Sequence, residues 1–166
     1  MTQQLLLGTT LAFEGNPLIT AWEDCAKIDT HGAVLIDSGQ IAAVGDRTQL
    51  RAAHPQADIV NYGDDLITAG FVDAHMHYPQ TAMIASWGKQ LIDWLNTYTF
   101  PEEARFADPA YATEIAWRTC DLALSHGTTT PTSFCTIHPA SVDPFLDPAA
   151  APRTAVSADK SCIVRN

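Results

Sequence analysis

The sequence lacks paired cysteines, long apolar runs and any recognisable targeting segment. Its four cysteines, Cys25, Cys120, Cys135 and Cys162, are widely spaced and form no C-x-x-C pair. This spacing argues against a disulfide scaffold and favours a reduced, cytoplasmic protein. No stretch approaches the roughly 18 apolar residues that a membrane helix needs, and the N-terminus lacks the basic start of a signal peptide. We therefore expect a soluble cytoplasmic chain with no membrane partner.

Basic residues are also scarce. Lys and Arg number 9 against 19 Asp and Glu, so the net charge is −10 and the isoelectric point is about 4.7. An acidic surface repels phosphates, so we expect no nucleic-acid partner. The composition is that of a globular protein. Of the 166 residues, 46% are hydrophobic, and this content is enough for a compact core.

The first part of the chain, residues 1–65, has the pattern of short strands. Residues 3–13 form one strand candidate, and residues 31–45 predict two strands around a turn at Ser38-Gly39. A short helical turn follows and stops near Pro55. His31 and His54 lie on polar stretches that we interpret as surface loops.

From residue 66 the pattern changes to alternating strands and helices. An apolar strand is expected over residues 66–77 and an amphipathic helix over 86–98. The strongest helix follows, with Asp108 as N-cap, Pro109 at its first position and Gly127 at its C-terminal stop. A Thr-rich strand begins at Gly127. This strand, helix, strand order predicts a parallel sheet, either an open α/β sheet or the start of an α/β barrel.

Trp87, Leu91 and Trp94 are spaced for one helix face, and we interpret them as core packing rather than as a wall for a planar ligand.

Two histidines stand at the end of the 66–77 strand. His75 and His77 are one residue apart, so on a strand their side chains point to the same side and Met76 points away. Two neutral imidazoles at this spacing can bind one zinc. The alternative is a pair of ordinary strand histidines. Asp73 either orients a ligand histidine or is a solvated strand residue.

The sequence around these histidines resembles that of the amidohydrolase superfamily, the metal-dependent hydrolases and deaminases of TIM-barrel fold. Within it, "HMHYPQTAMIASWGKQLIDWLNTYTFPEEARFAD" and "HGTTTPTSFCTIHPASVD" resemble the guanine deaminases. The resemblance covers residues 1–147 and is densest over 66–143. It implies an α/β chain in which residues 66–146 start a (β/α)8 TIM barrel. It also implies that residues 1–65 are part of a small β-sandwich domain.

The resemblance also implies site roles. His75 and His77 bind one Zn²⁺, and His77 and Gln80 contact the substrate guanine. An amide offers both a donor and an acceptor to a purine edge, although from the residues alone an exposed loop glutamine is the preferred interpretation of Gln80. The implied reaction is zinc-dependent hydrolytic deamination of guanine to xanthine and ammonia, in purine catabolism. Full-length members are expected to be homodimers. His138 is assigned no role.

The sequence departs from the family pattern in its length and in its last part. A closed barrel takes about 250 residues, so the barrel is expected to be incomplete here, with the proton-transfer residues beyond residue 166. Residues 147–166 form a divergent tail, with Pro148 and Pro152 where the family places a helix. We interpret the chain as a truncated or frameshifted copy that is inactive alone. The alternatives are another nucleobase deaminase or chlorohydrolase of the superfamily, or a non-catalytic metal-binding remnant.

Overall fold

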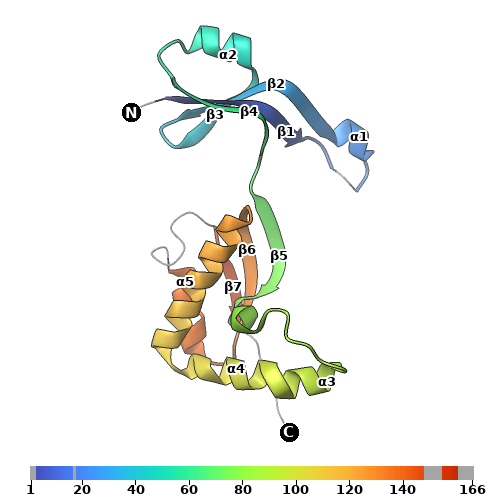
Figure 1. Ribbon diagram of the computed structural model, residues 1–166, viewed down its shortest axis with the longest axis vertical. Coiled ribbons are helices and arrows are strands. Elements are labelled where there is room, and N and C mark those ends of the chain that lie inside the picture. The colour runs from blue at the N-terminus through green and yellow to red at the C-terminus, as the bar shows by residue number, and fades with distance from the viewer. Residues whose placement is uncertain (1–2, 17, 148–154, 161–166) are drawn as a thin grey trace. The chain divides into compact units, whose positions relative to one another are not determined.

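The structure of the chain, a computed structural model, describes residues 3–16, 18–147 and 155–160. It divides into two compact units, Met1–Ala69 and Gly70–Asn166. Each unit has its own sheet (Figure 1). The prolines at 148 and 152 and the cysteine at 162, which entered the sequence interpretation, lie outside the described residues.

The first unit is built on a four-stranded sheet of order β3-β2-β1-β4. Its strands and helices are β1 (Gln4–Phe13), α1 (Trp22–Cys25), β2 (Ala26–Asp37), β3 (Gln40–Asp46), α2 (Arg47–Ala53) and β4 (Asp58–Thr68). β1 pairs antiparallel with β2 and parallel with β4. The core of this unit is a small cluster of buried residues: Leu5, Leu7, Ala33 and Leu35.

The predicted hairpin is confirmed. Ser38 and Gly39 both have positive φ, 54° and 80°, the conformation of a type I′ turn that matches the twist of paired strands. The helical turn α2 also forms, because the Asp46 carboxylate accepts hydrogen bonds from the N–H groups of Thr48 and Gln49, each at 2.9 Å.

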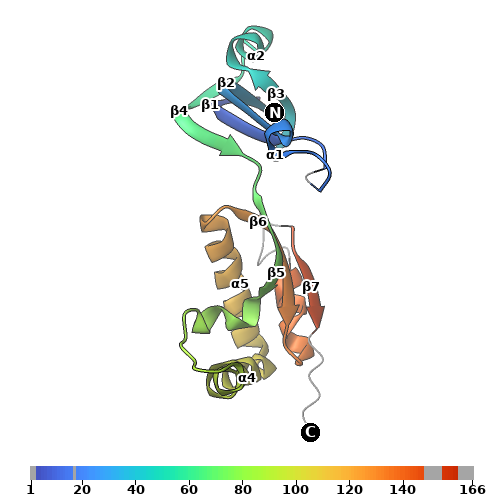
Figure 2. The same cartoon turned by 90° about the vertical axis from the view of Figure 1, so that its right-hand side faces the viewer.

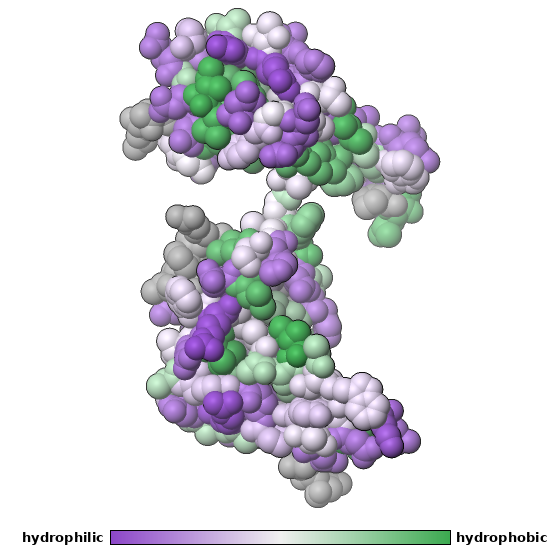
Figure 3. All heavy atoms as spheres, viewed as in Figure 1, coloured by the Kyte–Doolittle hydropathy of each residue, from purple (hydrophilic) through white to green (hydrophobic). Residues whose placement is uncertain are grey.

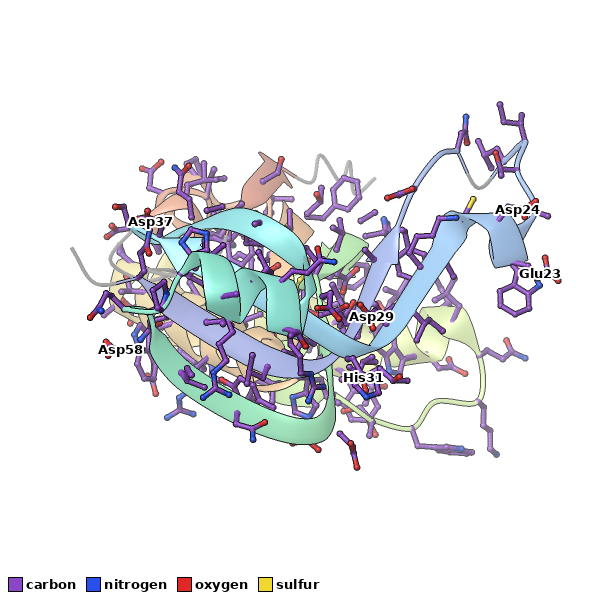
Figure 4. All side chains as sticks on the ribbon, turned by 90° about the horizontal axis from the view of Figure 1, so that it is seen from above. Glu23, Asp24, Asp29, His31, Asp37 and Asp58 are labelled. Carbon is purple, nitrogen blue, oxygen red and sulfur yellow. The ribbon has the colours of Figure 1, made fainter. Side chains whose placement is uncertain are left out.

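His31 does not lie in a loop as expected. It belongs to β2, where its side chain is exposed and its N–H donates to Asp29 Oδ1 at 2.8 Å. Figure 4 shows the labelled acidic side chains of this unit spread apart, with Glu23 and Asp24 at one end and Asp37 and Asp58 at the other. These carboxylates therefore do not converge on a common site.

The second unit is built on a three-stranded sheet of order β5-β6-β7, in which both pairings are parallel. Its strands are β5 (Phe71–His77), β6 (Thr128–Cys135) and β7 (Ser157–Lys160). The helical segments are η1 (Tyr78–Met83), α3 (Leu91–Trp94), η2 (Leu95–Thr99), α4 (Phe100–Ala104), η3 (Arg105–Ala107), α5 (Pro109–Ser125), η4 (Pro139–Ser141) and α6 (Asp143–Leu146). β7 lies in the segment that was expected to diverge.

Helix α5 lies beside the sheet in both ribbon views (Figures 1 and 2). Its predicted ends are confirmed: Asp108 Oδ1 accepts from the N–H of Ala110 at 2.9 Å, Pro109 opens the helix, and Gly127 follows it with φ of 85°. The buried face of α5 supplies half of the core of this unit. The core residues are Tyr78, Phe106, Ala112, Ile115, Ala116, Cys120, Cys135 and Phe145.

The strand expected over residues 66–77 is in fact two strands. Leu66–Thr68 pair with Thr9–Leu11 in the first sheet, and β5 begins only at Phe71. The break falls at Gly70, where an added Cβ would lie 2.1 Å from the hydroxyl oxygen of Thr129. Only glycine therefore fits where the backbone passes this close to the Thr129 side chain.

The expected helix over residues 86–98 starts later, at Leu91, and continues past Pro101. A π-helical turn, η2, precedes that proline. Proline has no N–H to donate, and a wider turn accommodates it where a regular helix would stop.

Apolar side chains are exposed in both units (Figure 3). On β5, Phe71 and Val72 are 59% and 67% exposed, although they lie in a strand. Within the described ranges, no helix is long and apolar enough to cross a membrane.

Candidate active site

The carboxyl end of β5 carries both predicted histidines. Their rings lie 5.4 Å apart, centre to centre, in an edge-to-face arrangement. Both also contact Phe134 of β6, at 5.4 Å from His75 and 5.3 Å from His77. Met76, between them, packs against the α5 core instead. The two imidazoles therefore share one side of the strand, as their spacing predicts.

A bulge in β5 sets up this arrangement. Asp73 pairs with Pro131 and Met76 with Ser133, so β5 holds one more residue than β6 over this stretch. The Asp73 carboxylate accepts from the backbone N–H of His75 at 3.1 Å. Of the two interpretations of Asp73, the structure thus supports a positioning one, directed at the main chain of His75.

The spacing of the two imidazole rings is compatible with a shared zinc ion. Two imidazoles bound to a tetrahedral zinc at about 2.1 Å have ring centres roughly 5 Å apart, close to the 5.4 Å found. Among the described residues, however, no group of three or more His, Cys, Asp or Glu side chains could hold a metal. If His75 and His77 are metal ligands, they are two members of a set that needs at least one more.

The protonation of His77 also suits a metal ligand. Burial and the nearby His75 lower the pKa of His77 below its ordinary value of 6.5, while Glu103 opposes them. A lower pKa favours neutral imidazole at neutral pH, and this is the form that binds metals.

The turn after the histidines is held by Tyr78. Its backbone N–H donates to Ser133 Oγ at 2.8 Å, and its hydroxyl donates to the carbonyl oxygen of Ser141. Its ring is fully buried and stacks on Phe145 at 4.6 Å. The start of η1 is thereby fixed to β6 and to the segment after it, and Gln80 follows two residues later.

Gln80 and His77 line the same hollow, which has a volume of about 360 Å³. Trp94 lines it as well and donates its indole N–H to the carbonyl oxygen of Ser86 at 3.1 Å. The amide nitrogen of Gln80 donates to Glu103 Oε1 at 3.2 Å. Glu103 was not anticipated, because a glutamate on a helix is normally solvated, whereas this one is only 9% exposed.

The comparisons with known proteins agree with this geometry. A model described as the amidohydrolase family matches residues 66–155, more than half of the chain. The chain belongs to the amidohydrolase family. A second model, described as an imidazolonepropionase-like composite domain of bacteria, matches residues 32–57.

This amidohydrolase chain is similar to several guanine deaminases. The guanine deaminase of Escherichia coli K12 is 38% identical over 136 residues, which cover 81% of this chain and 31% of that protein. The crystal structure of guanine deaminase from Bradyrhizobium japonicum superposes with a TM-score of 0.85 at 32% identity, over 95% of this chain and 35% of that one. A guanine deaminase from C. acetobutylicum, solved with guanine in its active site, gives a TM-score of 0.77 at 25% identity, over 95% and 36% of the two chains. The chain thus spans about a third of the length of these relatives.

The structure differs from the sequence interpretation at two of the three residues expected to pack in the core, and it gives His138 a structural contact. Trp87 and Leu91, interpreted as core residues, are 72% and 70% exposed, because the helix starts only at Leu91. Of that trio only Trp94 reaches the hollow. His138 serves a turn: its N–H donates to Thr136 Oγ1 and its carbonyl oxygen accepts from Ser141 Oγ.

Proposed function

We propose that this amidohydrolase chain is part of a zinc-dependent guanine deaminase and carries the first two metal ligands and a purine-binding amide. The observation that supports this most is the meeting of His77 and Gln80 in one hollow, with His75 beside them. In this proposal the parallel β5-β6-β7 sheet with α5 is the opening of a (β/α)8 barrel. The sheet of the first unit is part of a small β-sandwich domain.

Each of these residues has its own role in the proposed reaction. His75 and His77 would hold the zinc, which, when bound, supplies a Lewis acid that makes water nucleophilic near neutral pH. Gln80 holds the purine ring by its polar edge, since its amide both donates and accepts. Trp94 bounds the same hollow.

The products in this proposal are xanthine and ammonia, as in guanine catabolism. The carboxyl ends of parallel barrel strands form the catalytic face, and His75 and His77 lie at that end of β5. We further propose that the complete enzyme is cytoplasmic and homodimeric, as the resemblance implies.

Guanine binding by the zinc-loaded chain tests the proposal. Gln80→Ala should weaken binding about tenfold, because one hydrogen-bonded amide contributes about 1 kcal/mol or somewhat more. Gln90→Ala is the matched control, since Gln90 is an exposed glutamine at the start of α3. Equal affinity of the two variants, measured by ligand-observed NMR, would contradict the assignment of Gln80.

Turnover forms a separate arm of this experiment. Two histidines fall short of the three protein ligands of catalytic zinc sites. We therefore expect the 166-residue chain to bind guanine without sustained xanthine production. Steady xanthine formation by the pure chain would show that its site is complete.

A further inference from the structure

Glu103 is a buried carboxylate beside the candidate purine site, and the proposed reaction gives it no task. We propose that Glu103 is a positioning residue that fixes the orientation of the Gln80 amide and thereby selects purines that carry a hydrogen on ring nitrogen N1. This inference rests on the proposed function and extends it to specificity.

Burying the Glu103 carboxylate has a free-energy cost that a polar partner must offset. A carboxylate taken out of water costs several kcal/mol unless it is paired. The ion pairs of the described residues are Arg105–Glu102 and Arg118–Glu114, and neither includes Glu103. The neighbouring Glu102 instead pairs with Arg105 at 2.9 Å and accepts from the hydroxyl of Tyr111. Both glutamates are largely buried, since the Glu102 side chain is 13% exposed, but it is Glu103 that meets Gln80.

The contact permits only one orientation of the Gln80 amide. An ionised carboxylate accepts hydrogen bonds and cannot donate them. The amide NH₂ of Gln80 must therefore face Glu103, as the 3.2 Å contact from Nε2 to Oε1 shows. Turning the amide by 180° would set two acceptor oxygens against each other. One N–H and the carbonyl oxygen of Gln80 are then left for a ligand, in a fixed order.

This order distinguishes two purines that are otherwise alike. Guanine presents an N–H at N1 beside an acceptor oxygen on C6, whereas 2,6-diaminopurine presents an acceptor nitrogen at N1 beside an NH₂ donor. An amide in one orientation matches the first edge, and the same amide turned over matches the second. A site that cannot turn its amide over leaves polar groups of the wrong purine unpaired, which weakens its binding.

The dissociation constants of guanine and 2,6-diaminopurine, measured by NMR on the zinc-loaded 166-residue chain, test the inference. Wild-type chain should prefer guanine, and Glu103→Gln should lower this preference about three- to tenfold, because a neutral amide partner tolerates both orientations. Glu102→Gln is the matched control and should keep the wild-type ratio. Loss of packing alone would weaken both purines and leave the ratio unchanged.

The outcomes separate this inference from the function beneath it. If the wild-type chain binds neither purine, the proposed function fails and the inference with it. If folded Glu103→Gln keeps the guanine preference while Gln80→Ala loses it, the function stands and the role of Glu103 is refuted. Should Glu103→Gln fail to fold, hydrogen exchange of the Gln80 side-chain amide in the wild-type chain decides. It should be slower than that of the exposed Gln90 amide, and equal rates would overturn the inference.

Discussion

Tyr78 connects the core of the second unit to the candidate site, and removing one atom from it gives a sharp test. Tyr78→Phe deletes the hydroxyl that donates to the carbonyl oxygen of Ser141. It keeps the ring, which stacks on Phe145 with an angle of 14° between the planes. The substitution therefore isolates one buried hydrogen bond from the packing around it.

The expected loss follows from burial on both sides of that bond. Tyr78 and Ser141 are both fully buried, so the Ser141 carbonyl loses its partner where water cannot replace it. Leaving a buried acceptor unsatisfied costs about 1–3 kcal/mol. With a urea slope of about 2 kcal/mol/M, a loss of 2 kcal/mol lowers the unfolding midpoint by about 1 M.

Urea unfolding followed by tryptophan fluorescence measures this shift, because Trp87, Trp94 and Trp117 all belong to the second unit. Tyr62→Phe is the matched control: it removes the same atom from a side chain that is 46% exposed. That variant should stay within about 0.5 kcal/mol of wild type. Equal midpoints for Tyr78→Phe and Tyr62→Phe would refute the anchoring role of the Tyr78 hydroxyl.

Two further predictions concern backbone packing and alkaline pH. Gly70→Ala should destabilise the chain by about 1–3 kcal/mol, since the new Cβ would lie 2.1 Å from Thr129 Oγ1. Gly45→Ala, with nothing within 4 Å of its new Cβ, is the control, and a similar loss in both urea curves would contradict the steric argument. Burial, and then the hydrogen bond to Glu102, raise the pKa of Tyr111 to about 12 from its ordinary 10.0. The folded state thus favours the neutral phenol, and its stabilising effect is present below about pH 10 and is lost as pH rises toward 12. Phenolate absorbance should show a titration near pH 12 that is missing in Tyr111→Phe, and an unchanged titration curve in that variant would refute the assignment.

Local rules in the sequence predicted much of the fold. The Asp108 cap, Pro109 and Gly127 defined α5, and Ser38-Gly39 defined a hairpin. Such features depend on neighbours within a few residues, so the sequence alone carries them. The break at Gly70 depends instead on Thr129, which is distant in the chain. For this reason residues 66–77 were expected to be one strand and are two.

In the candidate site, too, some features follow from the local sequence and others depend on tertiary packing. The shared side of His75 and His77 followed from strand periodicity, and the structure confirms that their rings meet. Phe134 and Glu103 reach the site through tertiary packing, from β6 and α4. No local pattern distinguishes Glu103, which meets Gln80, from Glu102 beside it, which pairs with Arg105, so their different partners were not predictable from the sequence.

Zinc binding by the two histidines tests the central claim most directly. Zinc titration of the chain, free of any histidine tag, should show one weak site that is lost when His75→Ala and His77→Ala are combined. His31→Ala, which changes an exposed histidine of β2, should leave that site intact. Uptake of one zinc that survives the double substitution, or no uptake by the wild-type chain, would contradict the assignment of this pair as metal ligands.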